Sequence, residues 1–324
     1  MGEDSIPPVT TQPLAEAPNS AQRLPQGSIL ENRYQIEDVV GSGGMGAVYR
    51  ARDLHFNNVT KWVAVKEMAN LNEDRITFES SQRNFEREAN LLATLSHPSI
   101  PHIYDFFAKG AKSYLVMDFI SGSNLEKILK QSTGFIPEDQ VLQWAIELCA
   151  VLDYLHTHTP EPVVFRDMKP SNIIINPRNR VMLIDFGIAK AFKAGERGTV
   201  MGTEGYSPPE QYRGEFSPQV DIYALGATLH HVLTRKNPQL EAPFTFLERP
   251  IREVNPKVSP DFEAVVEKAV QYDAKDRFQS ASDMMDALLK VKRPEVTALH
   301  QAAPRVNQPT HAAQDGKRPL WAFE

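Results

Sequence analysis

Four polar side chains flank two short apolar runs, Ile-Ile-Ile and Val-Met-Leu-Ile, near the middle of the chain. Asp167, Lys169 and Asn172 precede the first run, and Asp185 follows the second. The turn-forming residues between the runs predict a β-hairpin. Because antiparallel pairing brings the beginning of one strand to the end of the other, these side chains should meet at one end of the hairpin. Two carboxylates, an amide and an ammonium in one place suit Mg²⁺, which takes one or two protein carboxylates together with phosphate oxygens.

A glycine-rich stretch is a second candidate for binding phosphate. Residues 41–46 read Gly-Ser-Gly-Gly-Met-Gly, with strand-like residues on both sides. They should therefore form the tip of a hairpin rather than the strand-to-helix turn of a dinucleotide fold. A tip without bulky side chains can approach phosphates and offer them backbone N–H groups. Because this glycine spacing also occurs by chance, a plain flexible turn is the alternative.

A lysine and a glutamate further along the chain form a candidate pair. Lys66 lies in the strand-like run 61–68, where alternation puts it on the same face as Ala64. Most lysines in strands only face water, so this position alone is weak support for a function. In the helix-like segment that follows, Glu88 falls inside an apolar stripe made of Phe85, Ala89, Leu92 and Leu95. A carboxylate directed at a core needs a cationic partner, and Lys66 is the candidate.

Composition excludes several classes of protein. The chain has 324 residues, a net charge of −6 and a single cysteine, Cys149. The negative charge argues against a nucleic-acid partner, and one cysteine excludes an intrachain disulfide or a cysteine-built zinc site. No run reaches the roughly 18 apolar residues of a membrane helix. The N-terminus also lacks the basic start and apolar core of a secretion signal. We therefore expect a cytoplasmic protein without a membrane span.

Both ends of the chain differ from the middle. Residues 1–30 and 294–324 are rich in proline and poor in large apolar side chains. Such segments bury too little surface to offset the entropy lost on ordering, so we expect two disordered tails around one domain at 31–293. Inside this domain Pro137 should open a long helix that is apolar nearly all round, with Cys149 as inert packing.

Together these segments resemble the eukaryotic-type Ser/Thr protein kinases, and are similar to the bacterial members of that family. The shared motifs, in the family's order, are G-S-G-G-M-G-A-V, V-A-V-K, a helix glutamate, F-R-D-M-K-P-S-N, D-F-G, S-P-P-E, Asp221 in D-I-Y-A-L-G and Arg277 in D-R-F. The resemblance covers about 34–292. It implies an α+β, bilobal fold with ATP in the cleft between the lobes. The small N-lobe, at about 31–118, would be an antiparallel sheet with one main helix, and the larger C-lobe, at about 122–293, mostly helical.

The resemblance also assigns roles to the phosphate-handling residues. Asp167 would accept the proton of the substrate hydroxyl, and Lys169 would neutralise charge on the transferred γ-phosphoryl group of ATP. Lys66, held by Glu88, would bind the α- and β-phosphates. The metal ion, Mg²⁺ with Mn²⁺ as an alternative, would be held by Asn172 and Asp185.

The resemblance places the rest of the nucleotide site on the glycine-rich segment, the sheet and the segment that links the lobes. Glycines would cover the phosphates, two small side chains would sandwich the adenine, and backbone groups of the linking segment would contact its edge. These residues are Val40, Gly41, Ser42, Gly43, Gly44, Met45, Gly46, Val48, Ala64, Met117, Asp118 and Ile120.

Two features imply that the substrates are proteins with Ser or Thr hydroxyls. Lys169, two residues after Asp167, is the Ser/Thr pattern of this family. Residues 202–210 resemble the segment that docks the backbone of a protein substrate, with Thr203 bridging Asp167 and Lys169. A buried ion pair between Glu210 and Arg277 would tie that segment to the C-lobe.

Phe165 departs from the family, which usually has histidine before Arg166. That histidine packs beneath the D-F-G segment and hydrogen-bonds to its backbone, a contact worth about 1 kcal/mol. Phenylalanine keeps the aromatic volume and touches no phosphate, so we interpret it as a tolerated variant. Two alternatives remain open: a catalytically weak nucleotide-binding scaffold, for which Phe165 is the support, and a phosphotransferase that acts on small molecules.

Thr199 is the predicted regulatory site. It is the only hydroxyl residue between Gly187 and Gly202, and Arg166, beside Asp167, is placed in this family to bind a phosphate there. We predict that the kinase phosphorylates itself on Thr199 and that the phosphate orders the segment through bonds to Arg166. Phosphopeptide mapping of active protein should find this modification. An unmodified Thr199, together with full activity of Thr199→Ala, would instead indicate a plain solvent-facing threonine.

Overall fold

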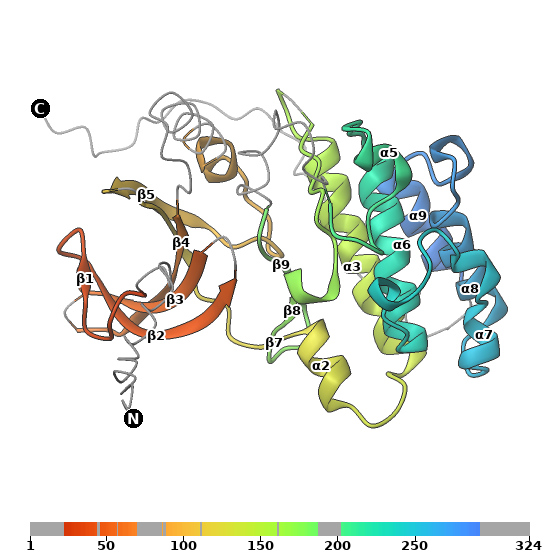
Figure 1. Cartoon of the computed structure of the whole chain (residues 1–324), viewed down its shortest axis with the longest axis horizontal. Helices are drawn as coiled ribbons and strands as arrows, with labels where there is room; N and C mark the ends of the chain where they lie inside the picture. The colour runs from red at the N-terminus through yellow and green to blue at the C-terminus, as the bar shows by residue number, and fades with distance from the viewer. Residues whose placement is uncertain are drawn as a thin grey trace, which may run out of the picture.

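The computed structural model describes residues 23–43, 46–56, 58–69, 86, 89–110, 112–160, 162–186 and 202–291. Within these ranges a sheet lies at one side of the molecule and a group of helices at the other (Figure 1). None of the helices in these ranges combines the length and hydrophobicity needed to cross a bilayer. The two expected tails lie outside the described residues, except for 23–30.

The sheet has six antiparallel strands in the order β1-β2-β3-β4-β6-β5. They are β1 (Ile29–Leu30), β2 (Tyr34–Gly43), β3 (Gly46–Asp53), β4 (Lys61–Ala69), β5 (Ile103–Lys109) and β6 (Lys112–Asp118). The hairpin expected around the glycine-rich segment is present, since Gly43 lies opposite Gly46. Along β3 the side chains alternate, so that Tyr49 and Ala51 are buried on one face while Val48 lies on the other.

Residues 23–30, which composition places in the N-terminal tail, contact the sheet, and Ile29–Leu30 form its strand β1. β1 pairs with β2, and the backbone N–H of Leu24 donates to the hydroxyl of Tyr49 at 3.1 Å. Leu24 and Leu30 pack in an apolar cluster on the buried face of β3. The tail therefore ends earlier than expected, because two leucines cover a face that the sheet would otherwise expose, which average composition does not reveal.

The helical part is built around two long helices. Its helices are α2 (Leu125–Gln131), α3 (Glu138–His156), α5 (Pro209–Tyr212), α6 (Pro218–Thr234), α7 (Ile251–Val254), α8 (Pro260–Ala269) and α9 (Ala281–Lys290). α3 packs against α6 and α9, and α6 is buried from Val220 to Thr234. As expected, α3 follows Pro137 and encloses Cys149, where burial raises the pKa of the thiol. The antiparallel sheet and the helical part confirm the predicted α+β, two-part fold.

A small three-stranded sheet lies between the two parts (Figure 1). Its strands β7 (Ser123–Asn124), β8 (Ile173–Ile175) and β9 (Val181–Leu183) pair in that order. The predicted hairpin is β8–β9, and the backbone N–H of Ile184 donates to the carbonyl of Asn172 at 2.9 Å. The segments before β8 and after β9 therefore lie side by side.

The segment 202–210 is packed tightly on the helices. The Tyr206 hydroxyl lies 2.6 Å from Nδ1 of His231 on α6, and both side chains are buried. Gly205 has a φ of +81°, and a Cβ there would lie 2.6 Å from the carbonyl carbon of Pro238. Only glycine fits this close approach without strain, so the path of the segment is fixed by both the Tyr206–His231 contact and the neighbouring backbone.

Glu210 and Arg277 form the buried ion pair that the resemblance implies. Arg277 Nη1 lies 2.5 Å from Glu210 Oε1, and Nη2 lies 3.0 Å from Oε2. The guanidinium also donates to the backbone carbonyls of Gln219, Gln271 and Tyr272. With all of its donors used, Arg277 joins α5, α6 and the segment before α9 at one point.

The buried histidines predict a loss of stability in mild acid. Burial lowers the pKa of His230 and His231 to about 4, below the unfolded value of about 6.5. The unfolded chain binds more protons between these values, so the free energy of unfolding should fall as pH drops from about 6.5 toward about 4. The expected slope is up to about 1.4 kcal/mol per pH unit for each histidine. Urea unfolding across this range measures it, and a slope that His231→Gln does not flatten would contradict this origin.

Breaking the Glu210–Arg277 pair should destabilise the fold strongly. Arg277→Met leaves the Glu210 carboxylate buried without its cation, and we expect a loss of about 3–5 kcal/mol in the free energy of unfolding. The double variant Glu210→Met/Arg277→Met should recover part of this loss because no charge remains buried alone. Urea unfolding of the single and double variants tests this, and additive losses would show that the charge pairing is not the cause.

Candidate functional site

A cleft of about 500 Å³ lies between the six-stranded sheet and the helices. Most residues expected to bind a nucleotide line it: Val40, Gly41, Val48, Ala64, Lys66, Met117, Asp118, Ile120, Asn172 and Asp185. Other lining residues were missed from the sequence, among them Leu92, Ile103, Leu115, Phe119, Asn124, Lys127, Ser171, Ile174, Ile184 and Phe186. Period-two alternation from Met117 in β6 and from Asn172 into β8 is the signal that would have found Leu115 and Ile174.

The glycine-rich segment contributes Gly41 to the wall of this cleft. Ser42 and Gly43 complete β2. Gly46, the first residue of β3, has a φ of +147°, and a Cβ there would lie 1.9 Å from the carbonyl oxygen of Glu67. This contact with the neighbouring strand requires glycine. Gly44 and Met45 of the predicted set lie outside the described residues.

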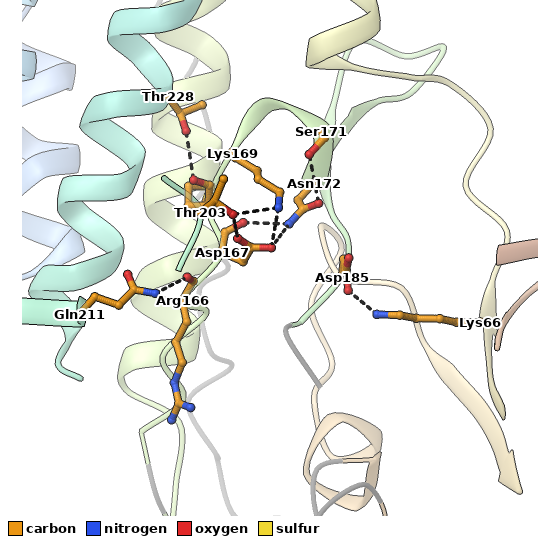
Figure 2. A network of polar contacts seen from close by, with 11 residues as sticks. Lys66, Arg166, Asp167, Lys169, Ser171, Asn172, Asp185, Thr203, Gln211 and Thr228 are labelled. Atoms are coloured by element: carbon orange, nitrogen blue, oxygen red, sulfur yellow. Dashed lines mark hydrogen bonds and ion pairs between the residues drawn. The ribbon is translucent and has the colours of Figure 1, made fainter. Parts of the chain in front are cut away.

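Asp167 is the centre of a network of side chains at the end of the β8–β9 hairpin (Figure 2). Thr203 donates to its Oδ1 at 2.6 Å, while Asn172 Nδ2 and Lys169 Nζ each lie 2.9 Å from Oδ2. Lys169 also donates to the Thr203 hydroxyl at 3.0 Å, so this hydroxyl bridges the lysine and the carboxylate. Asp167 is 5% exposed. Its carboxylate is thus held in one orientation by three side chains.

Asp185 lies beside this network, and Lys66 reaches it from the six-stranded sheet (Figure 2). Lys66 Nζ donates to Asp185 Oδ1, joining β4 to the end of the β8–β9 hairpin (Figure 2). Asp185 has a φ of +66°, an uncommon conformation for a residue other than glycine, and such residues cluster at functional sites. The partner predicted for Lys66, Glu88, lies outside the described residues. Asp185 is thus a contact of Lys66 that sequence reasoning did not find.

Asp221 on α6 anchors the loop that carries Asp167. It is fully buried, and its carboxylate accepts the backbone N–H groups of Phe165 and Arg166, each at 2.7 Å. His156 at the end of α3 lies 2.9 Å from the same carboxylate. The sequence motif D-I-Y-A-L-G marks Asp221, but its contact with residues 55 and 56 positions earlier has no signal in the local pattern.

Phe165 and Arg166 face opposite surroundings. Phe165 is buried and packs edge-on against Phe186, with ring centroids 5.2 Å apart, so its aromatic volume supports the D-F-G segment. The Arg166 guanidinium lies 4.3 Å from the ring of Phe216, and its Nε has no hydrogen-bond partner among the described residues. Thr199, whose phosphate is predicted to bind Arg166, lies outside the described residues.

Comparisons with known proteins agree with this geometry. The protein kinase domain family matches residues 34–293. The Serine/threonine-protein kinase PknB of Mycobacterium leprae is 34% identical over 81% of this chain and 43% of its own length. PknA of a Nostoc species, also named a serine/threonine-protein kinase, is 33% identical over 80% of this chain and 47% of its own. The chain thus spans less than half the length of these curated relatives.

Solved structures share the fold. The apo form of PpkA-294 aligns with a TM-score of 0.69 and 28% identity, over 82% of this chain and 99% of that one. The PknI kinase domain of Mycobacterium tuberculosis aligns with a TM-score of 0.64 over 82% of this chain and 98% of that one, and its 23% identity bears on the fold alone. With a family match over residues 34–293 and these relatives, the chain belongs to the protein kinase domain family.

Proposed function

We propose that this chain is an ATP- and Mg²⁺-dependent Ser/Thr protein kinase. It transfers the γ-phosphoryl group of ATP to Ser or Thr hydroxyls of proteins. The single observation that carries the proposal is the network around Asp167, in which Thr203, Lys169 and Asn172 hold one carboxylate at the edge of the cleft. The names of the curated relatives, which are serine/threonine-protein kinases, support the same reaction.

Asp167 is the base that receives the proton of the substrate hydroxyl. Its two carboxylate oxygens already accept bonds from a hydroxyl, an amide and an ammonium, which keeps the group oriented before the substrate arrives. Lys169, in contact with Asp167, supplies positive charge where the phosphoryl group leaves ATP. A phosphoryl transition state needs positioning and charge neutralisation, and these residues provide both.

The residues around the cleft fit a Mg²⁺–nucleotide complex. Asp185 offers a carboxylate to the metal ion. Nδ2 of Asn172 donates to Asp167, which leaves the amide oxygen Oδ1 of Asn172 as the atom that can coordinate a cation. These two residues would hold Mg²⁺, which neutralises charge on the phosphates. Lys66 would bind the α- and β-phosphates with Glu88 as its support, and the backbone of residues 41–46 would cover them.

Protein substrates are favoured over small molecules. Residues 202–210 are fixed on the helices through Tyr206 and through the Glu210–Arg277 pair, and Thr203 links this segment to Asp167. A rigid segment next to the base suits docking of an extended polypeptide. The scaffold alternative has no support beyond Phe165, since each phosphate-handling residue of the family pattern is present. We place the kinase domain at 31–293, together with strand β1, and its activity in the cytoplasm, where ATP is available.

Phosphoryl transfer can be tested by intact mass after incubation with Mg²⁺ and ATP. The wild type should gain phosphate, and Asp167→Asn should transfer it about 10²- to 10⁴-fold more slowly because the base is lost while the shape is kept. Asp286→Asn, on an exposed position of α9, is the matched control and should behave like the wild type. No phosphate on the wild type, and none on an added protein with Ser and Thr residues, would overturn the proposal.

A further inference from the structure

His102 and Tyr104, which do not line the cleft, hold the carboxylate of Asp118. Asp118 ends β6 and lines the cleft at the segment that links the two parts of the molecule. Its Oδ1 accepts the hydroxyl of Tyr104 at 2.5 Å. Its Oδ2 accepts the backbone N–H of His102 at 3.0 Å and lies 3.2 Å from His102 Nδ1. The backbone N–H of Asp118 in turn donates to the carbonyl of His102 at 3.0 Å.

A β-bulge turns Tyr104 toward this carboxylate. In the pairing of β5 with β6, Ile103 lies opposite Met117 and Asp105 lies opposite Val116, so Tyr104 is an extra residue without a partner. Bulges re-aim a side chain and are frequent beside active sites. Here the bulge lets Ile103 line the cleft while the next side chain reaches the linking segment from behind.

The ring of Tyr104 is itself held in place. Lys61 Nζ on β4 lies 3.7 Å from the centre of this ring and 5.3 Å from that of Phe56. The ammonium is thus attracted to the faces of two aromatic rings on the outer side of the sheet. Tyr104 is 39% exposed, so its place depends on these contacts rather than on burial.

The protonation states suit a lasting contact at neutral pH. Partial burial, together with the bond to Asp118, raises the pKa of Tyr104 to about 12, so the phenol keeps its proton. Burial alone would raise the pKa of Asp118, but the bonds from Tyr104 and His102 outweigh it and the net shift is downward. A protonated donor therefore faces an ionised acceptor, which is the strong form of a hydrogen bond.

We propose that Tyr104 and His102 are positioning residues for the nucleotide, acting through Asp118. By fixing the Asp118 carboxylate they would fix the peptide groups that follow, which the family resemblance places against the adenine edge. The inference depends on that function. Without the Tyr104 hydroxyl, the linking segment would sample other orientations, so nucleotide affinity would fall while the phosphate-handling residues stay unchanged.

Tyr104→Phe tests this proposal because it removes one hydroxyl and keeps the ring on Lys61. The matched control is Tyr34→Phe, since the Tyr34 hydroxyl donates to Asp105 Oδ2 at 3.1 Å, a second tyrosine–aspartate contact to β5. Asp105 does not line the cleft. Two readouts are compared: the Kd of the non-hydrolysable ATP analogue AMP-PNP by calorimetry, and the KM for ATP and kcat of phosphoryl transfer.

The expected result separates affinity from catalysis. Tyr104→Phe should raise the Kd of AMP-PNP and the KM for ATP roughly 5- to 20-fold with kcat little changed. The Tyr34 hydroxyl lies in a buried cluster. Tyr34→Phe should therefore lower the melting temperature at least as much as Tyr104→Phe does, and leave Kd and KM near the wild-type values. Equal effects of both variants on Kd would overturn the positioning role but leave the kinase proposal intact. A wild type that binds no AMP-PNP would overturn both.

Discussion

The buried carboxylate of Asp221 is the interaction on which the site depends. It accepts two backbone N–H groups of the loop before Asp167 and has His156 as a third neighbour. An ionised carboxylate without such partners would be costly to bury, so α6 and the loop stabilise each other. Arg166, held by this contact, adopts a φ of +69°, a conformation that a free loop would rarely populate. The position of the loop that carries Asp167 is thus held by a helix that contributes no group to the cleft.

Further contacts connect the loop that carries Asp167 to residues 202–210 and to the D-F-G segment. Thr203 connects the Asp167 carboxylate to residues 202–210, and Gln211 donates to the carbonyl of Arg166 at 2.9 Å. The Glu210–Arg277 pair holds the other end of that segment. Phe165 completes the arrangement by packing against Phe186, so the aromatic side chain takes the place of the usual histidine in volume but not in hydrogen bonding. Each of these contacts is polar or aromatic and at least partly buried, and together they hold the site from several sides.

Local patterns predicted most of the fold but not its long-range contacts. The β8–β9 hairpin follows from two apolar runs and a turn, and the burial of Cys149 follows from a helix that is apolar all round. By contrast, His156 meets Asp221 across 65 residues, and the Tyr104 bulge depends on how β5 is registered against β6. Neither has a signature in neighbouring residues. The packing of Leu24 was not predicted for a related reason. Leu24 contacts Tyr49, and this contact exists only after the sheet has formed.

In the proposed function, the contact between Lys66 and Asp185 would couple the binding of the nucleotide to the binding of the divalent cation. As long as Lys66 neutralises Asp185, a divalent cation alone must compete with an ammonium that is already in place. A nucleotide alone would bind Lys66 only by separating it from Asp185, and this carboxylate would then lie unpaired beside the negative phosphates. With both bound, Lys66 would contact the phosphates and Asp185 would hold the cation, so each ligand would remove the electrostatic penalty that the other would meet alone. The affinity of either one should therefore rise in the presence of the other by the same factor.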